Sequence, residues 1–246
     1  MVSPRPTSQN PDADRARSDL ARFLRIVTHD LRQPIAATRT IASVLADGHA
    51  GPLLPSQADL VTRLERRLEF MQALVDDLID LATANVGSGV DAARSVTPLG
   101  PAIGEACARN QAIAHAAGVV VQCDEVEDTL AVHADAADLA LMLDNLVGNA
   151  VKYSPGGRVR VSADRLSDTA RLVLADTGIG IPDEARTHLF EEFFRAPNAK
   201  AIDPLGTGLG LAIVKAIADR CRLTIDVESA EGRGTTVTVL FPLATA

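Results

Sequence analysis

Two apolar stripes at heptad spacing in the first half of the chain constrain its fold more than any other feature of the sequence. Within each stripe the positions alternate at intervals of four and three residues, the spacing of helices that pack side by side. The first stripe is Leu20, Leu24, Val27, Leu31, Pro34, Thr38, Ile41 and Leu45; the second is Val61, Leu64, Leu68, Met71, Val75, Leu78 and Ala82, flanked by Leu60, Leu74 and Leu81. Residues 47–56 contain glycines and prolines, so we expect a turn there and hence a helical hairpin.

The stripes are too wide for the two helices of one hairpin to cover by themselves. Two hairpins that pair as a four-helix bundle would bury them, which predicts a homodimer formed through the hairpin. The alternative is that the hairpin packs against the C-terminal half of its own chain.

The second half of the sequence mixes helical and strand patterns. We expect helices at 102–117, 135–153 and 211–220, and strands at 119–123, 159–163, 171–176, 223–227 and 235–240. Because these elements do not alternate as regular β-α-β units, they predict an α+β two-layer sandwich with helices on one face of a mostly antiparallel sheet. The expected fold class is therefore multidomain, with an all-α hairpin followed by this sandwich.

Breaks in the patterns give the expected domain boundaries. Residues 1–14 are polar and proline-containing, which indicates a disordered lead-in. The helical hairpin is expected at 15–85, and the periodicity stops across a glycine- and serine-containing linker at 86–96. The sandwich domain is expected at 97–246.

Charge and composition exclude several classes of function. The formal net charge of −8 argues against nucleic acid as a partner, because non-specific binding needs a basic surface. No apolar run approaches the roughly 20 residues of a membrane span, so we expect no membrane contact within this chain. The N-terminal residues also lack the apolar region of a signal peptide. The expected location is cytoplasmic, as a soluble protein or as the cytoplasmic part of a longer one.

The three cysteines, Cys107, Cys123 and Cys221, are far apart in the sequence. No pair of them has the spacing of a metal site or of a redox motif. We therefore expect free, buried thiols, as in proteins of a reducing compartment.

His29 lies between the stripe positions Val27 and Leu31, so its imidazole is expected to point away from the seam and into solvent. On this geometry alone, an ordinary surface histidine is the commoner outcome. The neighbours favour chemistry, because a neutral imidazole nitrogen can attack a phosphoryl group while Asp30 accepts a hydrogen bond from the other ring nitrogen. Pro34 costs about 3 kcal/mol in a helix interior, which suggests that a kink is wanted there.

The stretch from Thr28 to Pro34 resembles the phosphoacceptor box of sensor histidine kinases, with an acid just after the histidine and a proline five positions on. The resemblance implies that His29 accepts a phosphoryl group and that Asp30 assists; a solvated helix charge is the plainer interpretation of Asp30. Gln33 departs from the pattern, since many relatives have Thr or Asn there to position a water for dephosphorylating the partner. The Gln33 amide could also orient water, so phosphatase activity stays open.

Two motifs in the second half suit metal and base recognition. On a helix from Asn145 to Tyr153, the side chains of Asn145, Asn149 and Lys152 share one face, and an amide oxygen is a suitable ligand for Mg²⁺. In the stretch 176–182, a strand-end carboxylate, Asp176, can accept a hydrogen bond from an adenine amino group. Alone, such an Asp-x-Gly-x-Gly stretch is a common turn.

Two further motifs suit phosphate. The stretch 190–195 joins aromatic residues to Arg195, a combination that a core aromatic cluster beside a surface arginine also explains. The stretch 206–211 is glycine-rich and opens a helix, so its N–H groups and the positive end of the helix dipole can hold phosphate. It is neither a Walker A loop nor a Rossmann fingerprint, because no Gly-Lys-Ser/Thr follows and no strand leads directly into it.

In this order and spacing the four motifs resemble the ATP-binding domain that histidine kinases share with gyrase, Hsp90 and MutL, the GHKL or Bergerat type. The resemblance implies ATP and Mg²⁺ as cofactors. It assigns Asn149 to Mg²⁺, Lys152 to phosphate, Tyr153 to the nucleotide pocket and Arg195 to the γ-phosphate. The other expected nucleotide contacts are Asn145, Asp176, Gly178, Gly180, Gly206, Thr207, Gly208, Leu209, Gly210 and Leu211. Residues 183–207 are expected to form a lid over ATP.

Together the resemblances cover residues 15–243 and imply a protein-histidine kinase that phosphorylates itself on His29 and passes the phosphoryl group to an aspartate of a response-regulator receiver domain. Gyrase-like relatives place a water-activating glutamate where this chain has Asn145, and an asparagine cannot act as that base. Transfer is therefore favoured over hydrolysis. Two alternatives stay open: a GHKL-type ATPase, and a non-catalytic dimeric phosphotransfer or docking protein with a degenerate nucleotide domain.

Overall fold

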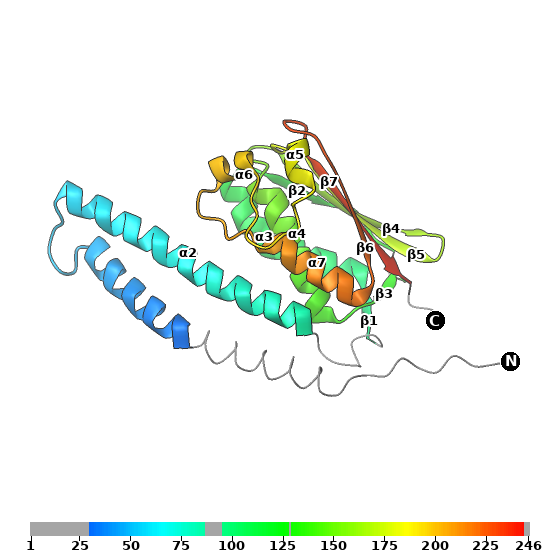
Figure 1. Cartoon of the computed structure of the whole chain (residues 1–246), viewed down its shortest axis with the longest axis horizontal. Coiled ribbons are helices and arrows are strands. Elements are labelled where there is room, and N and C mark those ends of the chain that lie inside the picture. Colours follow the sequence, from blue (N-terminus) through cyan, green and yellow to red (C-terminus); the bar gives the residue numbers. More distant parts are fainter. Residues whose placement is uncertain (1–29, 87–94, 128, 244–246) are drawn as a thin grey trace.

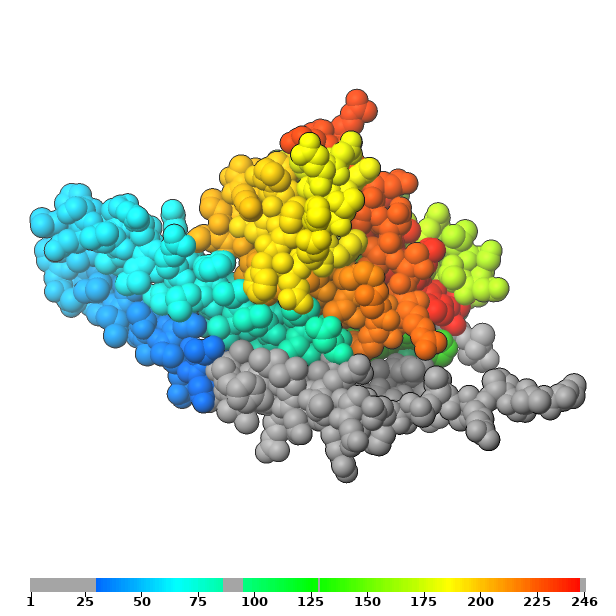
Figure 2. All heavy atoms as spheres, viewed as in Figure 1, coloured from blue at the N-terminus to red at the C-terminus, as the bar shows by residue number. Residues whose placement is uncertain are grey.

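The computed structural model describes residues 30–86, 95–127 and 129–243 (Figure 1). The expected lead-in at 1–14, most of the expected linker, and His29 lie outside the described residues. Within the described ranges a helical hairpin, blue to cyan, projects from an α+β body (Figure 2).

The hairpin consists of a first helix, described over 30–46, and of α2, Pro55–Val86. The chain reverses between them through Gly48 and Gly51, whose φ angles of +73° and +106° are readily adopted by residues without a Cβ. Arg32 of the first helix donates to Asp76 of α2, with Nε 2.8 Å from Oδ1. The described part of the first helix continues through Pro34 without a break.

Inside the hairpin the helices meet along a row of buried α2 residues seven positions apart, namely Val61, Leu68 and Val75. Leu68 and Val75 form one cluster with Ile35 and Ala42 of the first helix. Ile41, which the heptad pattern put on the seam, is 63% exposed in the single chain. The seam inside the hairpin therefore runs one position further along the first helix than predicted.

The other rows of the α2 stripe face away from the first helix. Leu74, Leu81 and Ala84 pack into the core of the α+β body. The alternative raised by the sequence, a hairpin that packs on its own C-terminal half, is thus realised at the C-terminal end of α2. A third row at heptad spacing remains 37–47% exposed and consists of Leu64, Met71 and Leu78.

The body is a five-stranded sheet covered by helices on one face (Figure 1). Across the sheet the strands are β2 (Val120–Cys123), β4 (Arg158–Leu166), β5 (Thr169–Asp176), β7 (Thr235–Pro242) and β6 (Thr224–Ser229). Neighbouring strands are antiparallel except β2 and β4. A short antiparallel pair that the sequence patterns did not predict, β1 (Val96–Pro98) and β3 (Ala131–His133), bridges to Leu243 just after β7.

Three longer helices and two short ones complete the body: α3 (Leu99–Ala116), α4 (Ala136–Lys152), α5 (Asp183–Arg186), α6 (Pro197–Ile202) and α7 (Gly210–Cys221). Alternate residues of β5, namely Ala170, Leu172 and Leu174, are buried, as expected of a sheet covered on one face. The predicted α+β sandwich after a helical hairpin is confirmed. None of the described helices has the length and apolar character needed to cross a membrane.

Arg220, near the end of α7, ties the end of α2 to the body. Its Nη1 donates to the carbonyl oxygens of Ala84 (2.7 Å) and Thr83 (3.2 Å), which belong to the last turn of α2 and have no partner within that helix. The same guanidinium forms an ion pair with Asp138 of α4, whose side chain is 6% exposed. Because a buried carboxylate needs a countercharge, this arginine serves both elements.

The expectation of three free thiols is wrong for one pair. Cys107 of α3 and Cys123 of β2 form a disulfide, and Cys221 is free. The chain turns through Gly118 between α3 and β2, so the two elements pack together and cysteines 16 positions apart in the sequence meet.

Candidate functional site

A cleft of about 820 Å³ lies between α4, the N-terminal end of α7, the segment with α5 and α6, and the middle of α2. Its size falls within the range of ordinary ligand pockets. Most residues predicted to contact a nucleotide line it: Asn145, Asn149, Lys152, Tyr153, Asp176, Gly180, Arg195, Gly206, Thr207, Gly208, Gly210 and Leu211. The four motifs, separate in the sequence, therefore meet at one cleft.

Some predicted site residues lie elsewhere. Leu209 is fully buried in the core, so its side chain supports the glycine-rich loop from behind. A Cβ at Gly178 would collide with the carbonyl oxygen of Tyr153, so this glycine allows close backbone packing. Asp30 and Gln33 are exposed on the first helix and do not line the cleft.

Asp176, at the end of β5, is fixed by three donors to one carboxylate oxygen. Its Oδ1 accepts from the Gly178 N–H (2.8 Å), the Ser154 hydroxyl (3.2 Å) and the Thr235 N–H (3.2 Å). Burial raises the pKa of Asp176, and these hydrogen bonds partly oppose the rise. Among the described residues no hydrogen bond reaches Oδ2, so this oxygen can accept from the amino group of a ligand.

The facing wall joins α4 to the first turn of α7. The amide of Asn145 donates to the Leu141 carbonyl at 2.9 Å. A Cβ at Gly210 would lie 2.7 Å from the Asn145 Oδ1, so only a glycine lets α7 begin this close to α4. Asn149 lines the cleft one helical turn further along.

The donor set fits magnesium. Within the ranges that the structure covers, no group of three or more His, Cys, Asp or Glu side chains is placed to hold a metal ion. The predicted ligand, the amide oxygen of Asn149, lies on a residue that lines the cleft. Mg²⁺ in nucleotide sites takes few protein oxygens and fills its remaining positions with water and phosphate oxygens, which matches this wall.

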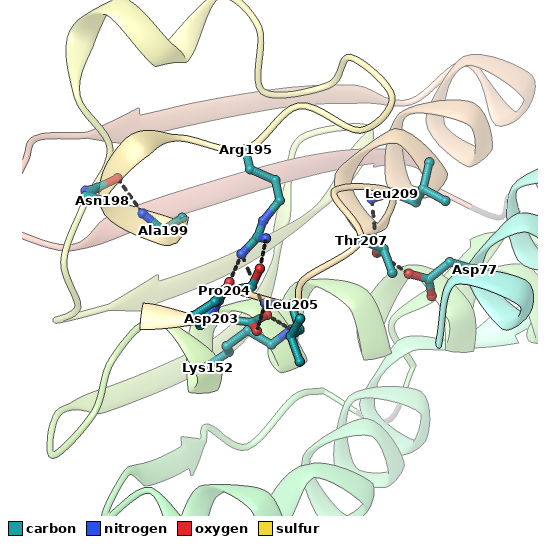
Figure 3. A network of polar contacts seen from close by, with 10 residues as sticks. All are labelled: Asp77, Lys152, Arg195, Asn198, Ala199, Asp203, Pro204, Leu205, Thr207 and Leu209. Atoms are coloured by element: carbon teal, nitrogen blue, oxygen red, sulfur yellow. Dashed lines mark hydrogen bonds and ion pairs between the residues drawn. The ribbon is translucent and has the colours of Figure 1, made fainter. Parts of the chain in front are cut away.

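Lys152 and Arg195 face a carboxylate, Asp203, that the sequence did not single out (Figure 3). Lys152 Nζ lies 3.0 Å from Asp203, and the Arg195 guanidinium lies 3.9 Å from the same group. Asp203 precedes the glycine-rich loop within the predicted lid and belongs to no recognisable motif. Its role depends on the folded positions of α4 and of the lid, so no sequence signal could have found it.

A second unpredicted carboxylate reaches the cleft from the hairpin. The Thr207 hydroxyl of the glycine-rich loop donates to Asp77 of α2 (Figure 3). Burial raises the pKa of Asp77, and the nearby Asp76 adds to the rise, while the Thr207 hydrogen bond and the charge of Lys152 oppose it. The hairpin therefore contributes directly to the wall of the site.

The aromatic motif is held against the glycine-rich loop. The Phe193 N–H donates to the Gly208 carbonyl at 3.1 Å, and Phe193 has a φ of +63°, which is rare for a bulky residue. This contact places Arg195, two residues on, inside the cleft.

Comparison with known proteins matches both parts of the chain. Residues 19–87 match the His Kinase A (phospho-acceptor) domain, and residues 134–245 match the histidine kinase-, DNA gyrase B- and HSP90-like ATPase family. The first match contains His29, and the second contains the whole cleft wall from Asn145 to Leu211. The chain belongs to the sensor histidine kinases of two-component systems.

Relatives and solved structures agree with this family. The chain is 30% identical to the cell-division control histidine kinase PdhS of Brucella canis over 96% of its own length and 24% of PdhS. It is 33% identical to the histidine-protein kinase/phosphatase MprB of Mycolicibacterium vanbaalenii, over 89% of its own length and 45% of MprB. The chain thus spans less than half of the length of each of these relatives.

Full-length ShkA, crystallised in complex with AMPPNP, superposes with a TM-score of 0.66 at 25% identity, over 92% of this chain and 46% of ShkA. The mycobacterial MprB structure matches with a TM-score of 0.55 at 28% identity, over 62% of this chain and all of that one.

The raised pKa of Asp77 predicts a pH-dependent effect of Asp77→Asn. A carboxyl whose pKa is raised by folding binds its proton more tightly in the folded state, so its contribution favours folding at low pH and is lost as pH rises through the folded-state pKa. Asparagine keeps an acceptor for Thr207 without the charge. Urea unfolding should therefore show Asp77→Asn to be more stable than wild type near pH 7.5, with the difference shrinking toward about pH 4.

Asp59→Asn, an exposed carboxylate on the same helix, is the matched control and should change the free energy of unfolding by about 0.5 kcal/mol or less at both pH values. If the free energy of unfolding of Asp77→Asn differed from that of wild type by the same amount at every pH, the pKa of Asp77 would not be raised by folding.

Proposed function

We propose that this chain is the core of an ATP-dependent protein-histidine kinase that phosphorylates itself on His29 and passes the phosphoryl group to an aspartate of a response-regulator receiver domain. The observation that carries the proposal is a single cleft lined by Asn149, Lys152, Arg195, the glycine-rich loop and Asp176. The matching phosphoacceptor domain in the same chain supplies the acceptor.

Each part of the cleft suits one part of ATP. Asp176 Oδ2 would accept from the adenine amino group, with Gly180 and Tyr153 beside the base. The N–H groups of the loop 206–210 and the positive end of α7 would hold the phosphates. Mg²⁺ held by Asn149 would neutralise phosphate charge. Lys152 and Arg195 would stabilise the charge on the transferred group, so catalysis is mainly positioning and electrostatics.

The acceptor side rests on the hairpin. Asp30, next to His29, would accept a hydrogen bond from one imidazole nitrogen, so that the other stays unprotonated and attacks in line. Asn145, in place of a water-activating glutamate, supports transfer to a side chain in preference to hydrolysis. Gln33, four residues after His29 in the sequence, is exposed, and its amide could orient a water.

The hairpin is expected to dimerise through an apolar row of α2 that is exposed in the single chain. The exposed row Leu64, Met71 and Leu78 would be buried by a second hairpin in a four-helix bundle. That bundle would present His29 to the nucleotide cleft and later to the receiver domain.

Autophosphorylation tests the central proposal. Wild-type protein incubated with Mg²⁺ and γ-labelled ATP should acquire acid-labile, base-stable label, while His29→Gln and Asn149→Asp should acquire none. His49→Gln, an exposed histidine at the hairpin turn, is the matched control and should label like wild type. Label that survives on His29→Gln would place the acceptor elsewhere.

Asp176→Asn tests base recognition. Asparagine can keep the three hydrogen bonds to its oxygen but presents an NH₂ group, a donor, to the adenine amino group, which is also a donor. ATP affinity measured by calorimetry should fall about 10- to 100-fold while the thermal midpoint stays close to wild type. Retention of full ATP affinity would rule out this contact.

Met71→Glu tests the dimer. A charge in the centre of the exposed row would be buried unpaired in a four-helix bundle, which costs several kcal/mol by order of magnitude. Sedimentation should show a dimer for wild type and a monomer for Met71→Glu. Thr62→Glu, exposed on the same helix but off the stripe, should remain dimeric. An unaltered dimer in Met71→Glu would show that this row is not the interface.

A further inference from the structure

Asp203 pairs with two of the cationic side chains that line the cleft, Lys152 and Arg195. Its carboxylate lies 3.0 Å from Lys152 Nζ on α4 and 3.9 Å from the guanidinium of Arg195. Lys152 belongs to the stretch 145–153, while Arg195 and Asp203 both lie in the predicted lid, and the three side chains meet in Figure 3. Lys152 and Arg195 are the groups that the proposed function assigns to phosphate.

The loop around Asp203 also encloses Arg195. The Arg195 guanidinium donates to the carbonyl oxygens of Asp203 and, at 3.2 Å, of Pro204. A Cβ at Gly206 would lie 3.0 Å from the Arg195 Cζ, so the loop packs directly on the guanidinium, and the Arg195 side chain is 10% exposed. Arg195 can therefore reach another anion only if this loop moves.

Asp203 carries its full charge at neutral pH. Burial alone would raise the pKa of Asp203, but the hydrogen bond and charge of Lys152, the Leu205 N–H and the charge of Arg195 together hold it below the ordinary value. Its carboxylate is then an anionic oxygen acceptor of the same chemical kind as a phosphoryl oxygen.

We propose that Asp203 is an internal competitor of the ATP phosphates for Lys152 and Arg195, and so sets the affinity of the cleft for nucleotides according to their phosphate charge. The inference rests on the proposed function. A triphosphate next to an ionised carboxylate is repelled, and both cannot take the same two cations. ATP binding must therefore displace the 203–206 segment, which also releases Arg195 toward the transferred phosphoryl group.

The competition acts on phosphate and not on the base. Asp176, which would bind adenine, lies at the end of β5, and no hydrogen bond or ion pair joins it to Asp203 in the part of the chain that the structure describes. Removing the Asp203 charge should thus strengthen ATP binding and leave adenosine binding unchanged. If Asp203 merely fixed the lid for productive binding, its removal would weaken ATP binding.

Calorimetric titration of the full chain with ATP and Mg²⁺, and separately with adenosine, tests this. Asp203→Asn should lower the Kd for ATP by about tenfold, the equivalent of about 1.4 kcal/mol, without changing that for adenosine. Asp164→Asn is the matched control, since it also removes one negative charge and one ion pair, with Arg171, but lies outside the cleft. It should leave both constants as in wild type.

Three outcomes would overturn the proposal. If Asp203→Asn bound ATP as weakly as wild type or more weakly, Asp203 would only hold the lid in place. If its Kd for adenosine fell as much as its Kd for ATP, the substitution would have opened the cleft in general. Failure of wild type to bind ATP at all would refute the nucleotide site itself, a result distinct from the other two. Asp203→Ser, which keeps an acceptor for the Leu205 N–H, provides a second neutral variant should asparagine disturb the loop.

Discussion

The structure depends on α2, which buries one apolar row against the first helix and another against the body. A helix that carries three adjacent apolar rows can cover each row with a different partner. The row containing Leu68 meets the first helix, the row containing Leu81 enters the core of the body, and the row containing Met71 remains for another surface. Since one rigid helix carries all three rows, the hairpin and the nucleotide cleft are parts of one mechanical unit. Asp77 reaches the glycine-rich loop because Leu74 and Leu81 hold α2 against the body.

The cleft combines close backbone approach with paired charge. Glycines at 206, 208 and 210 let the loop lie against Arg195, the aromatic motif and Asn145, where any side chain would collide. This closeness brings ionised groups together in a partly dry space, so each needs a counterpart. Lys152 and Arg195 find theirs in Asp203, and Asp176 uses three neutral donors instead. In the proposed binding mode, the phosphates of ATP replace Asp203 as the partner of Lys152 and Arg195.

Much of the fold could be predicted because its signals are local. The positions of α4, β4, β5 and α7 follow from apolar periodicity and turn residues, and the motifs around Asn149 and Asp176 are contiguous in the sequence. The remaining features depend on distant segments meeting. The Ser154 hydroxyl donates a hydrogen bond to Asp176, 22 positions away in the sequence. Asp77 reaches the cleft from α2, and Asp203 reaches it from the lid. Cys107 pairs with Cys123 because α3 packs on β2. Heptad spacing identifies the apolar stripe but does not show which row faces which partner. The sequence analysis therefore did not predict that Ile35 and Ala42 form the seam inside the hairpin.

The bond from Arg220 to the last turn of α2 bears on how the chain can be divided. Leu81 and Ala84 belong to the core of the body, and the carbonyl oxygens of Thr83 and Ala84 accept from Arg220, so the last turns of α2 pack as part of the body. A fragment that starts after residue 86 would lose two core side chains and leave an apolar groove along α7 open to water. For biochemical dissection, the last turns of α2 therefore belong to the C-terminal piece.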